Sequence, residues 1–265
     1  INQSIALATD EKYRQNNAAQ WLYSESHSYQ LKAWYELDFG IVTEGIKDVQ
    51  KAIEAAEKSI QLDPEDIKKQ HNVRILYNQL SYFYLEDQQT QSAQQAALTA
   101  IEKGQALKLK APFNQEYERE LAYSYTTAGE IYQSLNDLQT ALKYYQLSRE
   151  ISVRNYAADK NNYSTANDLA VDSLLIGDLL QQLGQTQKAE KMFTETEQMM
   201  APIHHAEPKN KYYAHSLLVA KLQLKKFDEA WPLYQLTHNN DMVDNAIETL
   251  LEKNNLQEWP STLIE

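Results

Sequence analysis

A small residue followed twelve positions later by alanine recurs along this chain, and this spacing constrains the fold more than any other feature of the sequence. The pairs are Gly40–Ala52, Ser81–Ala93, Gly129–Ala141, Gly177–Ala189 and, with a larger first member, Leu218–Ala230. Internal self-similarity of this kind is typical of a stack of helical hairpins, in which each repeat packs on its neighbours.

We expect the paired residues to lie at the seam between the two helices of each hairpin. The small residue on the first helix lets the second helix approach, and the alanine opposite keeps the gap narrow. An aromatic residue or leucine three positions further on is expected to fill the space beside them. The predicted seam residues are Gly40, Ala52, Ser81, Ala93, Gly129, Tyr132, Ala141, Gly177, Ala189 and Ala230.

The composition favours helices and limits the classes of partner. The 265 residues include only 6 Gly and 6 Pro, too few for the many tight turns of an all-β fold. The net charge of −12 argues against nucleic acid and against an anionic membrane surface, because both attract basic proteins. No segment approaches the ~20 apolar residues of a membrane span, so we expect no membrane insertion.

Several of these sets resemble the signature of a tetratricopeptide repeat. They are Gly40, Ala52, Ala56, Ser59 and Pro64; Gly129, Tyr132, Ala141 and Tyr145; and Gly177, Leu180, Ala189 and Phe193. The resemblance covers residues 33–244 in about five units, at 33–66, 74–107, 122–155, 170–203 and 211–244. It implies an all-α fold, a right-handed α-solenoid (superhelix) of helical hairpins.

The distances between successive repeats exceed the period of about 34 residues that is usual for this family. The first members of the pairs lie 41, 48, 48 and 41 residues apart. Seven residues make nearly two helical turns, so a helix lengthened by seven keeps its apolar face in register. We therefore interpret the excess as longer helices, with extra length in 108–121 and 156–169. The alternative is inserted loops, whose tips would be Ala111-Pro112 and Asn161-Asn162.

The two ends of the chain are less regular. Residues 1–32 are expected to form an N-terminal capping helix or an incomplete repeat. Residues 241–265 are expected to form a C-terminal capping helix and tail, with Asn240-Asp241 capping a helix from Met242 to about Lys253. Pro232 lies inside the second helix of the last hairpin, near its start or at a kink.

The resemblance also implies a concave groove, because in this family the first helix of each repeat lines the surface that holds a partner. The groove residues, placed by spacing, are Trp34, Glu44, Asn78, Tyr82, Tyr123, Thr126, Glu130, Gln133, Leu174, Asp178, Gln181, Tyr212 and His215. Glu44, Glu130 and Asp178 would make the groove acidic at intervals. We therefore expect a protein or peptide partner with basic and apolar residues.

One binding mode of the family is not carried over. Its chaperone-binding members hold a partner's terminal carboxylate with Lys, Asn and Arg in the groove. Here the corresponding positions are Leu37, Asn78 and Thr126, with no matching Lys or Arg.

The sequence contains no recognisable catalytic or metal-binding motif. Neither a glycine-rich phosphate loop nor a G-x-S-x-G turn is present, and the absence of Cys excludes thiolate chemistry. His204 and His205 are adjacent and cannot share a helix face, so a solvated turn between Pro202 and Pro208 is favoured over a metal site. We predict no catalytic residues, no metal and no cofactor.

The sequence thus predicts a non-catalytic, protein- or peptide-binding scaffold. The alternatives are a module for self-association into homo-oligomers and a sensor of a small ligand or signal peptide. Acidic-Leu-Ala segments at Glu120 and Asp168 resemble bacterial tetratricopeptide regions attached to regulatory and signalling proteins. The chain starts at Ile1 and not at Met, so we expect a fragment of a longer protein. We expect it to be soluble, in the cytoplasm or the periplasm.

Overall fold

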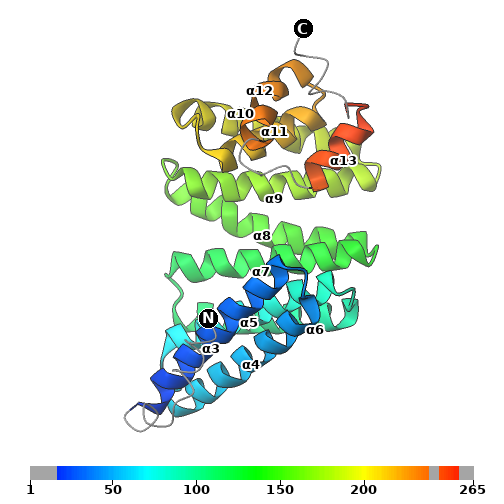
Figure 1. The fold of residues 1–265 in the computed structure, drawn as a ribbon. Coiled ribbons are helices and arrows are strands. Elements are labelled where there is room, and N and C mark those ends of the chain that lie inside the picture. Colours follow the sequence, from blue (N-terminus) through cyan, green and yellow to red (C-terminus); the bar gives the residue numbers. More distant parts are fainter. Residues whose placement is uncertain (1–16, 239–244, 257–265) are drawn as a thin grey trace. The chain divides into compact units, whose positions relative to one another are not determined.

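The computed structural model describes residues 17–238 and 245–256, and every regular element within these ranges is helical. Figure 1 shows the helices in chain order. They are α3 (Ala18–Asp38), α4 (Val42–Leu62), α5 (Ile67–Glu86), α6 (Thr90–Lys110), α7 (Gln115–Ser134), α8 (Leu138–Ala158), α9 (Tyr163–Gln182), α10 (Thr186–Ala206), α11 (Lys211–Gln223), α12 (Phe227–His238) and α13 (Asn245–Lys253). The predicted all-α class is confirmed.

The chain divides into two compact units, Ile1–Ser148 and Arg149–Glu265, called unit 1 and unit 2 below. In unit 1, α3 packs on α4 and α5 packs on α6; in unit 2, α9 packs on α10 and α11 packs on α12. Turns of three or four residues join consecutive helices from α3 to α12. Such short connections leave consecutive helices antiparallel and adjacent, which is the hairpin that the sequence predicts.

The first helices of successive hairpins begin at intervals of 48 residues, and a side-chain cap marks each start. The caps are Asp66 on α5, Asn114 on α7, Asn162 on α9 and Asn210 on α11. Each side-chain oxygen accepts a backbone N–H of the first turn, as Asp66 does from Lys68 at 2.9 Å. A cap of this kind stabilises a helix by ~1 kcal/mol, so the period is encoded in the helix starts.

The residues in excess of the usual repeat length are mostly helical. The first helices α5, α7 and α9 each have 20 residues, and the second helices α6, α8 and α10 each have 21. Ala111-Pro112 and Asn161-Asn162 lie in the turns that precede α7 and α9, as the loop-tip interpretation expects. In the last hairpin α11 has only 13 residues and α12 only 12.

In two hairpins the second helix places an aromatic ring directly on a glycine of the first helix. A Cβ added to Gly129 would lie 2.4 Å from Cε1 of Tyr145, and one added to Gly177 would lie 2.4 Å from Cε1 of Phe193. Both rings are buried. Ser81, Ala93, Ala141, Ala189 and Ala230 are also fully buried. Glycine is therefore required where the ring of the second helix crosses the first.

The predicted seam of the first hairpin is wrong by seven residues. Gly40 lies in the turn between α3 and α4 with a φ of +72°, and a Cβ there would meet no atom within 4 Å. The close approach occurs instead at Gly45, where a Cβ would lie 2.5 Å from Cε1 of Phe83 and 3.3 Å from the carbonyl oxygen of Ala33. Ala33 and Gly45 are also twelve residues apart. Ala52 is fully buried, because it follows Gly45 by seven residues, nearly two turns, and so lies on the same face of α4.

The ends of the chain also differ from the expected boundaries. α3 starts at Ala18, so the first hairpin includes much of the segment that was assigned to a separate cap. α13 occupies part of the predicted C-terminal helix, and its Ile247, Leu250 and Leu251 are buried. Residues 1–16 and the predicted cap Asn240-Asp241 lie outside the described residues.

Tyrosine hydroxyls connect successive hairpins in unit 1. Tyr77 on α5 donates to Glu57 on α4 at 3.0 Å, and Tyr125 on α7 accepts a hydrogen bond from Gln105 on α6 at 3.0 Å. The two pairs are related by the same 48-residue period. Each ring therefore buries its apolar body between hairpins while its hydroxyl finds a polar partner.

We predict that Gly129→Ala lowers the free energy of unfolding by about 1–3 kcal/mol, because the added methyl overpacks the buried Tyr145 ring. Alanine otherwise favours a helix over glycine by ~1 kcal/mol, so the sign of the change is diagnostic. Urea denaturation measures the effect, with Gln139→Ala on the exposed surface of α8 as the control. In the Gly129→Ala/Tyr145→Leu double variant the glycine substitution should cost much less. A stabilising Gly129→Ala substitution would contradict this packing.

Candidate functional site

The first helices of three hairpins in unit 1, α3, α5 and α7, line two adjoining clefts. The cleft of about 80 Å³ is lined by Gln30, Trp34, Arg74, Ile75, Asn78, Gln79, Tyr82, Glu120 and Tyr123, and we call it the aromatic cleft. The cleft of about 290 Å³ is lined by Tyr23, His27, Gln30, Lys68, His71, Asn72, Ile75, Glu116 and Tyr117, and we call it the histidine cleft. The two clefts adjoin, since they share Gln30 and Ile75, and we call them together the groove.

Three exposed aromatic side chains form the rim of the aromatic cleft. Trp34 is 41% exposed, Tyr82 37% and Tyr123 60%. The ring centroids of Trp34 and Tyr82 lie 6.1 Å apart, and Trp34 also meets Phe83 edge-on at 5.4 Å. The buried Phe83 thus anchors a set of rings whose outer faces remain open to solvent.

A buried arginine forms the base of the cleft. Arg74 is only 1% exposed, and its Nη2 donates to Oε2 of Glu120 at 2.5 Å. Its Nη1 donates to the Glu120 carbonyl at 3.2 Å and to Oγ of Ser124 at 3.1 Å. Burial lowers the pKa of Arg74, and the Glu120 carboxylate partly offsets this effect. The pair links α5 to α7 across 46 residues of sequence.

Polar atoms without a hydrogen-bond partner in the described structure cluster beside this pair. They are Nε of Arg74, Oδ1 of Asn78, Nε2 and Oε1 of Gln79 and, in the histidine cleft, Nδ1 of His71. Asn78 is 5% exposed and Gln79 is 4% exposed. An unpaired buried polar group costs ~1–3 kcal/mol, so four such atoms on three cleft residues of α5 need a compensating role.

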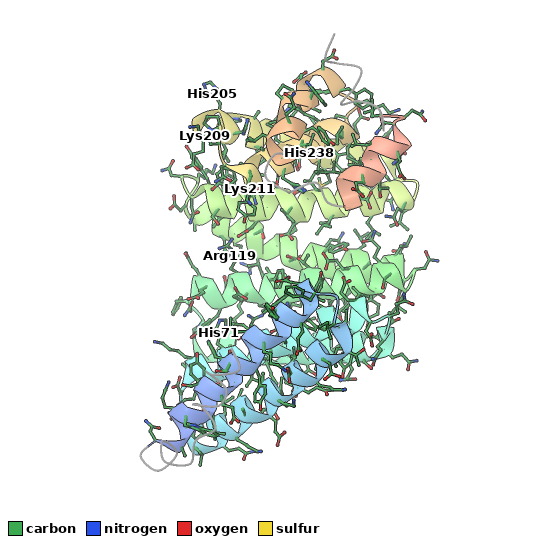
Figure 2. All side chains as sticks on the ribbon, in the orientation of Figure 1. His71, Arg119, His205, Lys209, Lys211 and His238 are labelled. Atoms are coloured by element: carbon green, nitrogen blue, oxygen red, sulfur yellow. The ribbon has the colours of Figure 1, made fainter. Side chains whose placement is uncertain are left out.

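The histidine cleft is polar but holds its two histidines in the neutral form. Burial, reinforced by the charge of Arg74, lowers the pKa of His71 to about 4. His71, labelled in Figure 2, lies on α5, and its ring centroid is 4.8 Å from that of Tyr117. Burial also lowers the pKa of His27, whose ring lies 4.8 Å from Tyr23. These imidazoles act as hydrogen-bonding groups rather than cations at neutral pH.

Comparison with known proteins places this fold. The tetratricopeptide repeat model matches residues 122–151, which cover most of α7 and the following part of α8. A putative kinesin light chain from Podosopora anserina, solved as nearly identical TPR-like repeats, is 16% identical with a TM-score of 0.53, over 86% of this chain and 95% of that chain. No curated protein matches the sequence. The chain has the tetratricopeptide-repeat fold.

Two further solved structures share this fold over most of the chain. Aspartyl phosphate phosphatase F from Bacillus subtilis is 15% identical with a TM-score of 0.60, over 94% of this chain and 60% of that chain. A Rap protein complexed with competence and sporulation factor is 15% identical with a TM-score of 0.53, over 89% of this chain and 65% of that chain. The tetratricopeptide-repeat chain thus spans less than two thirds of either protein's length.

Four of the groove residues predicted for this tetratricopeptide-repeat chain come together in the aromatic cleft. They are Trp34, Asn78, Tyr82 and Tyr123, from three different hairpins. Glu130 lies seven residues after Tyr123 on α7, close to the same face. The side chain of Glu130 reaches solvent. The surrounding protein still removes part of its hydration, and this desolvation raises the pKa of Glu130 to about 7.

Three other predicted groove residues of unit 1 lie elsewhere. Glu44 is on the second helix α4, where it pairs with Lys47 at 2.6 Å. Thr126 is buried and donates to Ser148 on α8, and Gln133 accepts a hydrogen bond from Tyr145. Successive residues of a helix are rotated by ~100° about its axis, so Thr126 and Gln133 lie about 60–80° around α7 from Tyr123. Their side chains therefore face α8, the partner helix of the hairpin.

The remaining predicted groove residues belong to unit 2. They are Leu174, Asp178 and Gln181 on α9, and Tyr212 and His215 on α11. Leu174 is buried, whereas Tyr212 is exposed. Asp178 accepts a hydrogen bond from Gln182 at 2.7 Å, and Gln181 accepts one from Lys253 at 3.0 Å. That these residues line a groove stays a prediction.

The sequence did not single out Arg74, Gln79, Glu120 or His71 as site residues. The second repeat was placed at 74–107, but α5 starts at Ile67, so His71 fell outside the repeat. The true start of α5 could have been found from the Asp or Asn that recurs every 48 residues before the first helices, and His71 would then have fallen inside the repeat. The Arg74–Glu120 pair has no comparable local signal, because it joins two hairpins.

Within the described ranges, no group of three or more His, Cys, Asp or Glu could hold a metal ion. His204 and His205 lie in the last turn of α10 and not in a loop, because Pro202 is accommodated inside that helix. None of the helices in the described part is long and apolar enough to cross a membrane.

We predict that His71 makes the stability of the chain fall in acid. The unfolded chain binds a proton on His71 near pH 6.5, but the folded chain resists it until about pH 4, so the free energy of unfolding decreases as the pH falls through this window. Urea denaturation should show that the free energy of unfolding of the wild type decreases between about pH 6.5 and pH 4. This decrease should exceed that of His71→Gln by about 1–2 kcal/mol. Equal pH dependence of the two proteins would contradict the neutral, buried state of His71.

Proposed function

We propose that this tetratricopeptide-repeat chain is a non-catalytic scaffold that binds an extended segment of a protein or peptide in the groove of α3, α5 and α7. The observation that carries the proposal is the set of unpartnered atoms on Asn78, Gln79 and Arg74 beneath an exposed aromatic rim. The groove is open to a ligand, and its base is incomplete without one.

An extended peptide suits these atoms because its backbone offers both donors and acceptors. Oδ1 of Asn78 and Oε1 of Gln79 can accept N–H groups, whereas Nε2 of Gln79 and Nε of Arg74 can donate to a carbonyl. The rims of Trp34 and Tyr82 supply apolar area for side chains. A ligand made of alternating amides and side chains would therefore satisfy the base and cover the rim together.

The similar structures support a binding role of this kind. The Rap protein was solved in complex with competence and sporulation factor, and its likeness to this chain extends over 89% of the sequence. Phosphatase F shares the fold as well, but the groove here presents amides, phenols and an arginine already paired with a carboxylate. These groups position a ligand rather than transform it. We propose that the scaffold serves a larger regulatory protein.

The proposal is tested by replacing Gln79 with leucine, which has a similar size and no polar atoms. Binding is measured by retention of a randomised peptide library on immobilised protein. The wild type should retain peptides, and Gln79→Leu should retain far fewer. Its free energy of unfolding should be unchanged or higher by about 1 kcal/mol, because an unpaired buried amide is removed.

The matched control is Gln139→Leu, which makes the same substitution on the exposed surface of α8. It should retain the same peptides as the wild type. If Gln79→Leu is folded and binds the library as the wild type does, the binding site lies elsewhere and the proposal is wrong. A large loss of stability in Gln79→Leu would show that the amide serves the fold instead.

A further inference from the structure

We propose that the aromatic cleft is a subsite for an arginine side chain of the bound segment. This inference rests on the proposed function, and it adds the identity of one ligand group to it. Three features of the cleft point to a guanidinium: the open faces of the rim, the excess of carboxylates around it, and the unpartnered acceptors at its base.

The rim offers stacking surfaces for a planar cation. Tyr123 on α7 is the most exposed of the three rings, and Trp34 and Tyr82 lie 6.1 Å apart on α3 and α5. A guanidinium stacks on such faces and is attracted by their negative quadrupole. The cleft has a volume of about 80 Å³. A single water needs ~10–15 Å³ of such space, so the end of one side chain fits where a whole small molecule does not.

The charges around the rim favour a cation. Beyond the effect of burial, Glu86 and Glu130 lie close enough to Tyr82 to raise the pKa of its hydroxyl, Glu130 also raises the pKa of Tyr123, and Glu120 lines the cleft. The one guanidinium at the base, Arg74, is already neutralised by Glu120. Burial is the main cause of the raised pKa of Tyr82 and of Tyr123, and neighbouring carboxylates raise both further.

The base of the cleft supplies acceptors that a guanidinium can use. Oδ1 of Asn78 and Oε1 of Gln79 are buried and unpartnered, and both residues are more than nine-tenths buried. A guanidinium carries five N–H donors in a rigid plane, whereas an ammonium carries three. The guanidinium can therefore donate to both fixed oxygens at once. The two unpartnered donors, Nε2 of Gln79 and Nε of Arg74, are then available to backbone carbonyls of the ligand.

The test compares arginine with citrulline, which has nearly the same shape but no charge. Two synthetic libraries of blocked, randomised peptides carry one of these residues at a fixed central position. Retention on the immobilised full chain is measured at about pH 8, where Glu130, with a pKa of about 7, is ionised. We expect the wild type to retain the arginine library roughly tenfold more than the citrulline library.

The local origin of this preference is tested by neutralising one carboxylate at a time. Glu130→Gln should reduce the arginine preference severalfold. Glu102→Gln, on the exposed surface of α6, changes the net charge equally and should leave the preference intact. A lysine-centred library should be retained less than the arginine library.

The outcomes separate this inference from the function on which it rests. If both libraries are retained equally, the peptide groove stands and the arginine subsite is overturned. If neither library is retained, the proposed function and the subsite both fail. An arginine preference that Glu102→Gln reduces as much as Glu130→Gln would mean that net charge alone causes it, which also overturns the subsite.

Discussion

The packing of an aromatic ring on a glycine determines how closely the two helices of a hairpin approach, and the rest of the structure depends on that distance. Tyr145 covers Gly129 and Phe193 covers Gly177, one period apart. In the hairpins α7–α8 and α9–α10, this contact sets the distance between the first and the second helix. The first helices α3, α5 and α7 of unit 1 line the groove with the faces that they do not bury in the hairpins. Seam and site are therefore two sides of the same helices.

The groove combines features that would each weaken a fold whose only requirement was stability. Arg74 is buried with a single carboxylate partner, and Asn78 and Gln79 next to it lack partners for their amide atoms. Buried ion pairs seldom add net stability, and unpaired amides reduce it. Such a cost is tolerated where ligand binding completes the hydrogen bonds. The long helices compensate, because each adds about two turns of packing, and the first helices α5, α7 and α9 also have a capped start.

The sequence predicted the hairpins and part of the site, and the residues that it missed have identifiable causes. The Gly129 and Gly177 spacings locate two hairpins directly, because only a small residue fits beneath a ring. Gly40 was misleading because it lies twelve residues before the buried Ala52 but serves the turn between α3 and α4, where its positive φ favours glycine. Asn78 and Tyr82 follow from helical spacing, whereas the Arg74–Glu120 pair arises between hairpins 46 residues apart. Unlike the tyrosine contacts between hairpins, this pair does not recur, because Ala122 lies 48 residues after Arg74.

The most direct test of the account is nuclear magnetic resonance of the side-chain amide groups during titration with the arginine-centred peptides. The NH₂ signals of Asn78 and Gln79 report on the base of the groove itself. We predict that both signals shift with ligand concentration and that their hydrogen exchange slows at saturation. If both stay unchanged while signals on the second helices α4 and α6 shift, the ligand binds another surface and the account of the groove is contradicted.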